Sequence, residues 1–373
     1  MSKATAVIFL GGIGGSPVTD MVANCQRAVT KDTIERIQQT NVFDRAILVA
    51  ERPERLPSVV VEPSGKPFHF GRKLREVIER YHIETPFYIG GGSSPLLTSS
   101  GLRKIAERIA SATDTVITNN PFSSDLVAFN PGRAIEAIDL PATDNPLAQR
   151  LATRAGLRLV TLPRTARYQF DVDTPTDLLI LKLHPGIGRH TKGYLESLRL
   201  DISRLEQAAR MFSDANAQIT VAGRVGSHVW SQLECKTSCR VRLLAEERSL
   251  NADERARRGE VRTVLGFYLE QVGMERFFQA LAQLGHAAFI DTRVLFTHFG
   301  LKPTADDRFH SDLGQHDKID DPFIREFTRK SLEAPIPVIL GGHSLVSGGL
   351  LALIEIAHRK AARQAVDTKS AVK

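Results

Sequence analysis

Short apolar runs alternate with helical patterns over residues 1–185, and this alternation constrains the fold more than any other feature of the chain. Strand patterns cover residues 4–10, 45–50 and 86–89, and helical patterns cover residues 71–81 and 99–111 between and after them. Alternation of this kind is typical of a mostly parallel sheet with helices on both faces. The sequence therefore predicts an α/β fold for this half of the chain.

The length of the chain and one break in its pattern predict two domains. A chain of 373 residues exceeds the roughly 100 to 200 residues of a usual domain. A histidine, a proline and two glycines follow a helical pattern near residue 185 and mark a boundary. We expect a first domain over residues 1–185, a second α/β or α+β domain of unassigned role over 190–363, and a polar tail over 364–373.

The second half mixes helical and strand patterns. Strand patterns lie near residues 217–221, 288–295 and 335–340. Helices are expected over residues 191–213, where we predict one long amphipathic helix, over 261–284, and over 345–363.

The net charge and the number of cysteines indicate which binding partners and which cellular compartment to expect. The net charge of +7 favours anionic partners, but the basic residues are spread along the chain without interleaved aromatics. A nucleotide or sugar phosphate fits this distribution better than a nucleic acid. Three cysteines, an odd number, favour a reduced cytoplasmic location. No apolar stretch reaches the roughly 18 residues of a membrane span, so no membrane partner is expected.

A glycine-rich loop follows the first predicted strand. Ligands of parallel α/β sheets bind outside the carboxyl ends of the strands. Gly11, Gly12, Gly14 and Gly15 stand at such an end, where their backbone amides could approach a phosphate or a nucleobase closely. The loop has neither the lysine of the common phosphate loop nor the spacing of a dinucleotide-binding loop. A plain strand-to-helix turn is the alternative interpretation.

Two further loops after strands carry small and polar residues. The first runs from Gly90 to Thr98 and contains Ser93, and the second contains Asn119 and Asp125. Asparagine often does no more than stabilise a turn. Asp125 is either a site residue or a solvated residue at the start of a strand.

Two carboxylates flank one apolar residue near the end of the first domain. In an extended segment over residues 170–173, Asp171 and Asp173 leave the same face and could share one divalent cation. Thr174 and the proline after it are typical of a helix cap and a first helical position. A cap alone would explain Thr174 and Asp177, while for Asp173 the ligand and the cap interpretations stay open.

The order of these motifs resembles the MobA-like nucleotidyltransferases, a superfamily that includes the molybdenum cofactor, phospholactate and sugar-acid nucleotidyltransferases. The resemblance rests on the first glycine loop, the turn from Gly92 to Thr98 with its Pro-Leu pair, and the closing Asp-Val-Asp-Thr-Pro-x-Asp-Leu, and it covers residues 1–185. It implies a Rossmann-like nucleotide-binding sheet. It also implies transfer of a nucleotide from a nucleoside triphosphate to an acceptor oxygen, with release of pyrophosphate.

Carried over by position, the resemblance assigns roles and exposes two departures. Gly11, Gly12, Gly14 and Gly15 would lie along the nucleotide, and Asp173 would hold Mg²⁺ near its phosphates. The family has an arginine and a lysine after its first loop, for which Arg27 and Lys31 are the nearest substitutes here. It also has a metal-binding aspartate where this chain has Ser93, so Asp171 or Asp125 would have to compensate.

The second half carries polar residues whose roles the sequence leaves open. A Gly-Gly-His-Ser run over 341–344 precedes the last helical pattern, and its His343 reads as a general acid or base or as a capping donor. Asp291 and Arg293 interrupt an apolar strand pattern and would bury a charge pair. Arginines around residues 240–262 read as a solvated helix face. In the Asp-rich loop expected over 306–321, the first candidates for metal ligands are His310, Asp312 and His316.

The leading hypothesis is a nucleotidyltransferase-like enzyme with Mg²⁺ at Asp173 and Asp171, an NTP over the first glycine loop, and a small anionic acceptor near Ser93 and Asn119. Its catalytic residues would be Asp173 and Asp171, and Asp125 is a further candidate metal ligand. The alternative is a nucleotide- or metabolite-binding protein whose transferase site has decayed. The sequence is compatible with a homo-oligomer.

Overall fold

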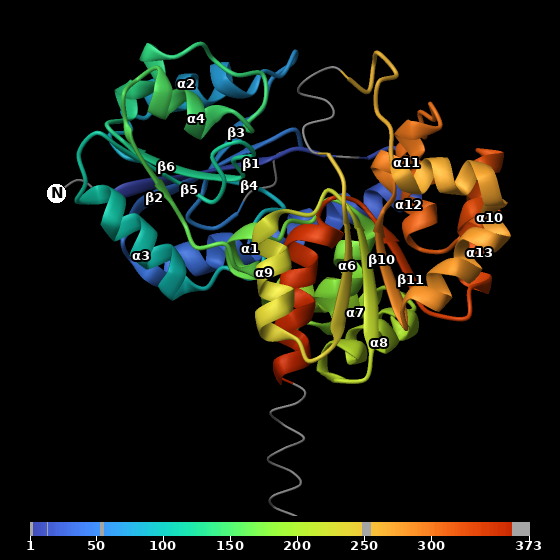
Figure 1. Ribbon diagram of the computed structural model, residues 1–373. Coiled ribbons are helices and arrows are strands. Elements are labelled where there is room, and N and C mark those ends of the chain that lie inside the picture. The colour runs from blue at the N-terminus through green and yellow to red at the C-terminus, as the bar shows by residue number, and fades with distance from the viewer. Residues whose placement is uncertain (1–2, 13, 53–55, 248–254, 360–373) are drawn as a thin grey trace, which may run out of the picture. The chain divides into compact units, whose positions relative to one another are not determined.

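The computed structural model describes residues 3–12, 14–52, 56–247 and 255–359. They form two compact units, each of them an α/β sheet with helices (Figure 1). The first unit comprises residues 1–13, 23–171 and 188–194, and the second comprises residues 14–22, 172–187 and 195–373. The tail expected over 364–373 lies outside the described residues. The expected boundary near residue 185 stays a prediction.

The sheet of the first unit has seven strands in the order β3-β2-β1-β4-β6-β5-β7. All are parallel to their neighbours except β6, which is antiparallel to both β4 and β5. The predicted mostly parallel α/β sheet is thus confirmed. The strands are β1 (Ala4–Leu10), β2 (Phe43–Ala50), β3 (Val60–Pro63), β4 (Pro86–Gly90), β5 (Thr115–Thr118), β6 (Leu126–Asn130) and β7 (Arg158–Thr161).

Alternate residues of β1 point into two apolar cores on opposite faces of this sheet. Ala6 and Ile8 pack with side chains of α1 and α3, whereas Val7 and Phe9 pack with side chains of α2 and α4. Burial on both faces explains the continuous apolar run of this strand. The helices here are α1 (Pro17–Thr40), α2 (Phe70–Arg80), α3 (Ser99–Ala110), η1 (Gly132–Ala137), α4 (Leu147–Thr153) and α5 (Ala166–Gln169).

The sheet of the second unit has four strands, all parallel, in the order β11-β10-β8-β9. The second domain is therefore α/β, one of the two classes predicted. Phe289 of β10 stacks on Phe212 with ring centroids 5.5 Å apart, and an apolar core that includes Phe277 and Phe327 also packs on β10 and β11. The strands are β8 (Gln218–Gly223), β9 (Arg240–Ala245), β10 (Ala287–Asp291) and β11 (Val338–Gly341).

The helices of the second unit surround this sheet, and α10 is kinked at Gly273, whose φ is 71°. The π-turn η4 continues as an α-helix over residues 350–359. None of the helices in the described ranges is long and apolar enough to span a membrane. Helix α7 (Arg189–Ser197) begins in the first unit and ends in the second. The other helices are α6 (Pro175–Leu183), α8 (Ser203–Arg210), η2 (Met211–Ser213), α9 (Ser227–Lys236), α10 (Val264–Leu284), α11 (Thr292–His298), α12 (Ala305–Asp312), η3 (His316–Lys318), α13 (Pro322–Glu333) and η4 (Leu345–Gly349).

Several predicted elements were wrong. The single helix expected over 191–213 is divided into α7, α8 and η2, since residues 198–202 are not helical. The arginines of 240–242 lie on β9, an edge strand, and not on a helix. The strand expected over 288–295 ends at Asp291, whose carboxylate accepts a hydrogen bond from the Arg293 amide and caps α11. The loop expected over 306–321 contains most of α12.

Candidate functional site

The order of strands in the first unit defines where a ligand is expected. The chain builds β1, β2 and β3 outward in one direction and then returns to place β4 on the other side of β1. In open α/β sheets such a reversal opens a crevice at the carboxyl ends of the two central strands. Gly11 and Gly12 follow β1 at this edge, and Gly91 follows β4.

The first glycine loop is open to solvent. Gly11 and Gly12 are exposed, and a side chain at Gly11 would meet nothing within 4 Å. At Gly12 the nearest atom to an added Cβ would be a Glu51 carboxylate oxygen at 3.9 Å. Gly14 and Gly15 belong to the second unit and are also exposed. The backbone of this loop is therefore accessible, as nucleotide binding would require.

The second glycine loop is fastened to the sheet. The Gly91 amide donates to the Phe9 carbonyl at 2.8 Å. An added Cβ on Gly91 would lie 2.7 Å from the Leu10 Cδ1 and 3.1 Å from the Leu10 Cα, so a larger residue would have to displace its neighbours. Ser93 is buried and forms an isolated antiparallel bridge with Asp171. The Ser94 amide donates to the Asp171 carboxylate at 3.2 Å. This loop and Asp171 thus hold one another in place.

Asn119 fastens the third loop. Its side-chain oxygen accepts the amides of Asp125 at 3.2 Å and Leu126 at 3.1 Å, and its side-chain nitrogen donates to the Tyr168 carbonyl at 3.1 Å. With 2% of its surface exposed, Asn119 is part of the framework of the turn. This is the structural role that the sequence offered as the alternative. A contact between Asn119 and an acceptor stays a prediction.

The charges of three carboxylates act on the buried phenol of Tyr88 on β4. The Tyr88 hydroxyl donates to the Asp144 carboxylate at 2.6 Å. Burial raises the pKa of Tyr88 well above its usual range, and the negative charges of Asp144, Asp125 and Asp171 raise it further. Burial also raises the pKa of Asp144. The charges of two predicted metal ligands, Asp125 and Asp171, thus act on one side chain, although its hydroxyl is hydrogen-bonded to Asp144.

Sequence reasoning missed the role of Asp144. Asp144 and Asn145 precede α4, but neither caps it, since its N-cap is Pro146 and no side-chain cap forms. Asn145 instead accepts a hydrogen bond from the Ser123 hydroxyl at 3.0 Å. Tyr88 lies 56 residues before Asp144, so no local pattern signals their contact.

The closing motif is a capping box at the start of α6. Thr174 is the N-cap and Pro175 the first helical residue, as predicted. The Asp177 carboxylate accepts the amides of Thr174 at 2.8 Å and Asp173 at 3.0 Å, which confirms Asp177 as a cap residue. Burial raises the pKa of Asp177 to about 7, and the negative charge of Asp173 contributes.

The two aspartates that precede this cap have different surroundings. Asp171 belongs to the first unit and is half-buried, whereas Asp173 belongs to the second unit and is exposed. The strand expected over residues 170–173 was wrong, because only the isolated bridge at Asp171 forms there. The metal-binding and catalytic roles of Asp171 and Asp173 stay predictions.

The two basic residues nearest to the first loop in sequence lie on α1. Both Arg27 and Lys31 are half-buried. Arg27 donates to the Asn24 side-chain oxygen at 2.6 Å. This bond uses one of the five N–H donors of the guanidinium, so Arg27 keeps donors for a triphosphate.

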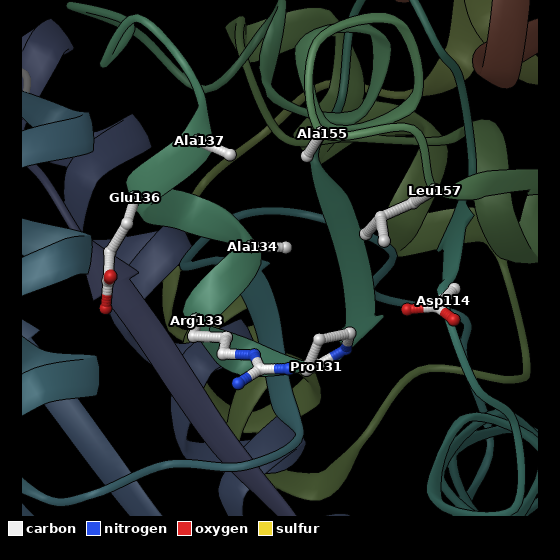
Figure 2. Close-up of a pocket in the computed structure, with 8 residues that line it drawn as sticks. All are labelled: Asp114, Pro131, Arg133, Ala134, Glu136, Ala137, Ala155 and Leu157. Carbon is white, nitrogen blue, oxygen red and sulfur yellow. The ribbon is translucent and has the colours of Figure 1, made fainter.

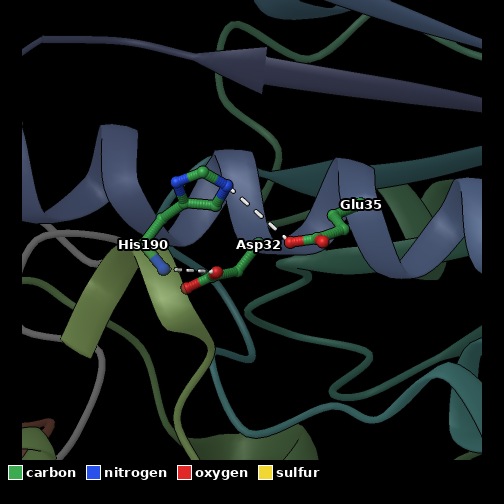
Figure 3. Close-up of side chains that lie close together, drawn as sticks. All are labelled: Asp32, Glu35 and His190. Carbon is green, nitrogen blue, oxygen red and sulfur yellow. Dashed lines mark hydrogen bonds and ion pairs between the residues drawn. The ribbon is translucent and has the colours of Figure 1, made fainter. Parts of the chain in front are cut away.

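Asp32, Glu35 and His190 form the one group of three metal-type ligands that the described ranges contain (Figure 3). The Asp32 carboxylate accepts the amides of His190 and Thr191, both at 2.9 Å. Glu35 pairs with Arg189 at 3.0 Å and lies 3.7 Å from the His190 ring nitrogen. Asp32 is therefore the cap at the start of α7, and the Arg189 charge disfavours a cation beside Glu35.

The metal site guessed in the Asp-rich segment is wrong. His310, Asp312 and His316 do not come together as a group of ligands anywhere in the described ranges. The Asp312 carboxylate is hydrogen-bonded to Arg293 at 2.9 Å, and the His310 ring pairs with the Gln315 side chain at 2.9 Å. An arginine therefore takes the place that a cation would need.

A shallow pocket of about 410 Å³ lies in the first unit, away from the carboxyl edge (Figure 2). Asp114 and Leu157 directly precede β5 and β7, and Pro131 directly follows the antiparallel β6. The pocket is thus at the amino ends of the parallel strands, where ligands of such sheets do not usually bind. Its other lining residues are Arg133, Ala134, Glu136, Ala137 and Ala155.

Comparison with known proteins gives structural similarity at a low level. No protein-family model matches the chain, and no curated protein matches it in sequence. A cytidylyltransferase from Leptospira borgpetersenii is 14% identical with a TM-score of 0.38, and the match covers 52% of this chain and 93% of that one. A 4-diphosphocytidyl-2C-methyl-D-erythritol synthase is 17% identical with a TM-score of 0.35, covering 49% and 98%. A CMP:2-keto-3-deoxy-manno-octonic acid synthetase complexed with CTP is 14% identical with a TM-score of 0.34, covering 48% and 97%.

Proposed function

We propose that the chain is a nucleotidyltransferase-like enzyme, which transfers a nucleoside monophosphate from an NTP to a phosphorylated or sugar-type acceptor with the help of Mg²⁺. The observation that carries the proposal is the point of reversal between β1 and β4, where an open glycine loop follows one strand and a fastened glycine loop follows the other. An NTP would lie along Gly11 and Gly12, because exposed glycine amides can approach phosphate oxygens closely.

The carboxylates near Tyr88 suit a hard cation. Mg²⁺ prefers oxygen ligands and is often bound through one or two carboxylates together with substrate phosphates. Asp171 and Asp125 supply such oxygens, and Asp144 is a third carboxylate that acts on the same phenol. Asp173, exposed and two residues after Asp171, is the further ligand that the sequence resemblance implies. Bound Mg²⁺ would neutralise charge on the phosphates and orient them for attack.

The reaction would proceed by attack of an acceptor oxygen on the α-phosphorus. A new P–O bond forms as the bond to pyrophosphate breaks, and pyrophosphate leaves with the electron pair. Such transfers depend on positioning and on stabilising developing charge, each electrostatic group being worth roughly 2 to 4 kcal/mol. Ser93 stands where the family has a metal-binding aspartate, so the remaining carboxylates must supply that stabilisation.

The test separates catalysis from simple binding. Each of the four NTPs is titrated with and without Mg²⁺, and pyrophosphate release is measured with phosphorylated and sugar-type acceptors. We expect Mg²⁺-dependent NTP binding that Asp173→Ala weakens. Replacement of Asp317, another exposed aspartate of the second unit, by alanine should leave this binding unchanged.

Two outcomes would change the conclusion. Metal-independent NTP binding without pyrophosphate release would favour the alternative, a nucleotide-binding protein with a decayed transferase site. Absence of NTP binding altogether would refute both. The Asp171→Asn variant provides a second measurement, since it keeps an oxygen that can accept the Ser94 amide while it removes the charge.

A further inference from the structure

The second unit has its own point of reversal. Read from one edge, its strands run β9-β8-β10-β11, so the chain moves from β8 outward to β9 and then returns to the other side of β8 (Figure 1). The crevice rule for parallel α/β sheets places a ligand at the carboxyl ends of β8 and β10. Arg224 follows β8, Asp291 ends β10, and Gly342 follows β11 at this edge.

The first arginine at this edge is fully paired. Arg224 donates to the Asp291 carboxylate through Nε at 2.6 Å and Nη2 at 3.1 Å. Burial alone would raise the pKa of Asp291, but the charges of Arg224 and Arg293 hold it below its usual range. Gly223, with a φ of +131°, allows this approach, because an added Cβ would lie 2.4 Å from the Asp291 Cβ. This pair is charge-balanced.

The charge of one carboxylate, Asp312, acts on two further arginines, Arg293 and Arg308. Arg293 forms a fork with Asp312, with nitrogen-to-oxygen distances of 2.9 and 3.3 Å. Arg308 lies one helical turn before Asp312 on α12, and its Nε donates only to the Thr304 carbonyl at 3.3 Å. In the described part of the chain no ion pair joins Arg308 to a carboxylate. Burial lowers the pKa of Arg308, and the neighbouring charge of Arg293 lowers it further.

The backbone of Gly342 lies beside the guanidinium of Arg293. An added Cβ on Gly342 would lie 3.6 Å from Nη2 of Arg293 and 3.3 Å from the Thr174 methyl carbon. Any longer side chain at residue 342 would thus extend against the guanidinium. Half-buried positive charge is costly unless a counter-charge accompanies it. The charges of Asp291 and Asp177 also act on Arg293, so Arg308 is the arginine of this cluster that, among the described residues, has no ion-paired carboxylate.

We propose that the second unit binds a small phosphorylated molecule at the carboxyl edge of its sheet, with Arg293 and Arg308 pairing with the phosphate. Guanidinium groups match phosphate oxygens through charge-assisted, often bidentate hydrogen bonds. A phosphate dianion supplies the counter-charge that Arg308 lacks, with Asp312 still holding Arg293 in position. The site lies wholly within the second unit and does not depend on nucleotide transfer.

The experiment is a calorimetric titration of the full-length protein with inorganic phosphate, and with acetate in parallel. We expect Arg308→Gln to weaken phosphate binding about tenfold or more, the usual effect of losing one charged hydrogen bond. The matched control is Arg276→Gln, which removes an exposed arginine of α10 in the same unit and should leave binding unchanged. Arg308→Lys should retain part of the affinity, because it keeps the charge without the fork.

Two results would overturn the proposal. One is phosphate affinity that Arg308→Gln leaves unchanged, since the ion would then bind elsewhere, for example at the first glycine loop. The other is acetate binding as tight as phosphate with equal losses in Arg308→Gln and Arg276→Gln, which would indicate only a general attraction of anions. Circular dichroism of each variant checks that it folds. The Arg308 variants should fold, because replacing Arg308 removes no ion pair among the described residues.

Discussion

Replacement of the buried Asp177 by asparagine should change how the stability of the second unit depends on pH. Burial and the charge of Asp173 raise the pKa of Asp177 from 3.8 to about 7, so the folded protein holds a proton that the unfolded chain releases near pH 4. The stabilisation that this proton gives the folded state is therefore fully present below about pH 4 and is lost as pH rises to about 7. This difference of about three pH units corresponds to about 4 kcal/mol.

The measurement uses the only tryptophan, Trp230, which lies on α9 of the second unit and reports on that unit's unfolding. Urea unfolding is followed by its fluorescence at several pH values between 4 and 7.5. Residue 177 cannot ionise in the Asp177→Asn variant, so the variant does not lose this stabilisation as pH rises. Its free energy of unfolding, relative to that of the wild type, should therefore increase by up to about 4 kcal/mol. Any constant cost of a weaker cap cancels in this comparison.

Two controls make the result decisive. Asp317→Asn, at an exposed position of the same unit, should differ from the wild type by the same amount at every pH. Asp173→Asn removes one of the two causes and should make the pH dependence of the wild type shallower. A difference between Asp177→Asn and the wild type that stays constant from pH 4 to 7.5 would refute the reasoning.

Three further predictions concern stability. Gly188→Ala should destabilise the first unit, because its Cβ would lie 2.1 Å from the Asp32 carboxyl carbon. Gly193→Ala, with nothing within 4 Å of its Cβ, should be neutral or stabilising. Thermal unfolding by circular dichroism compares the two variants, and equal effects would contradict the predicted clash with Asp32. Asp291→Ala should cost about 3 to 5 kcal/mol, since it leaves Arg224 without its carboxylate, as measured by urea unfolding with Trp230 fluorescence, and a loss below about 1 kcal/mol would be inconsistent with a buried pair. Tyr88→Phe should cost about 1 to 2 kcal/mol, because the half-buried Asp144 carboxylate loses its donor, and an unchanged melting curve would count against that hydrogen bond.

The buried strands of the first unit could be predicted because their apolar runs are continuous. Residues 4–10 were assigned with the bounds that β1 has. The two strands that were missed, β3 and β7, are four residues long and lie at the two edges of the sheet, where burial is incomplete. In β9 the alternating arginines of an edge strand were mistaken for a helix face. Short edge strands carry too little hydrophobic pattern to be recognised alone.

Local motifs were more predictable than contacts across the chain. The cap formed by Thr174, Pro175 and Asp177 follows from neighbouring residues and was found. Asp32 caps α7 through amides 158 and 159 residues away, and Asp144 meets Tyr88 across 56 residues, so neither role has a local signature. The predicted strand through Asp291 failed because an aspartate at a strand end also starts helices.

The segment Gly188–Tyr194 belongs to the first unit although it follows α6 of the second. A protein truncated at residue 185 would therefore lose the helix start that Asp32 caps, and would expose a carboxylate that is now 3% accessible. The two units are interwoven along the chain in the manner of an insertion and not joined end to end. Recombination that replaced one unit would have to preserve several chain crossings between the units at once. This favours inheritance of the two units together.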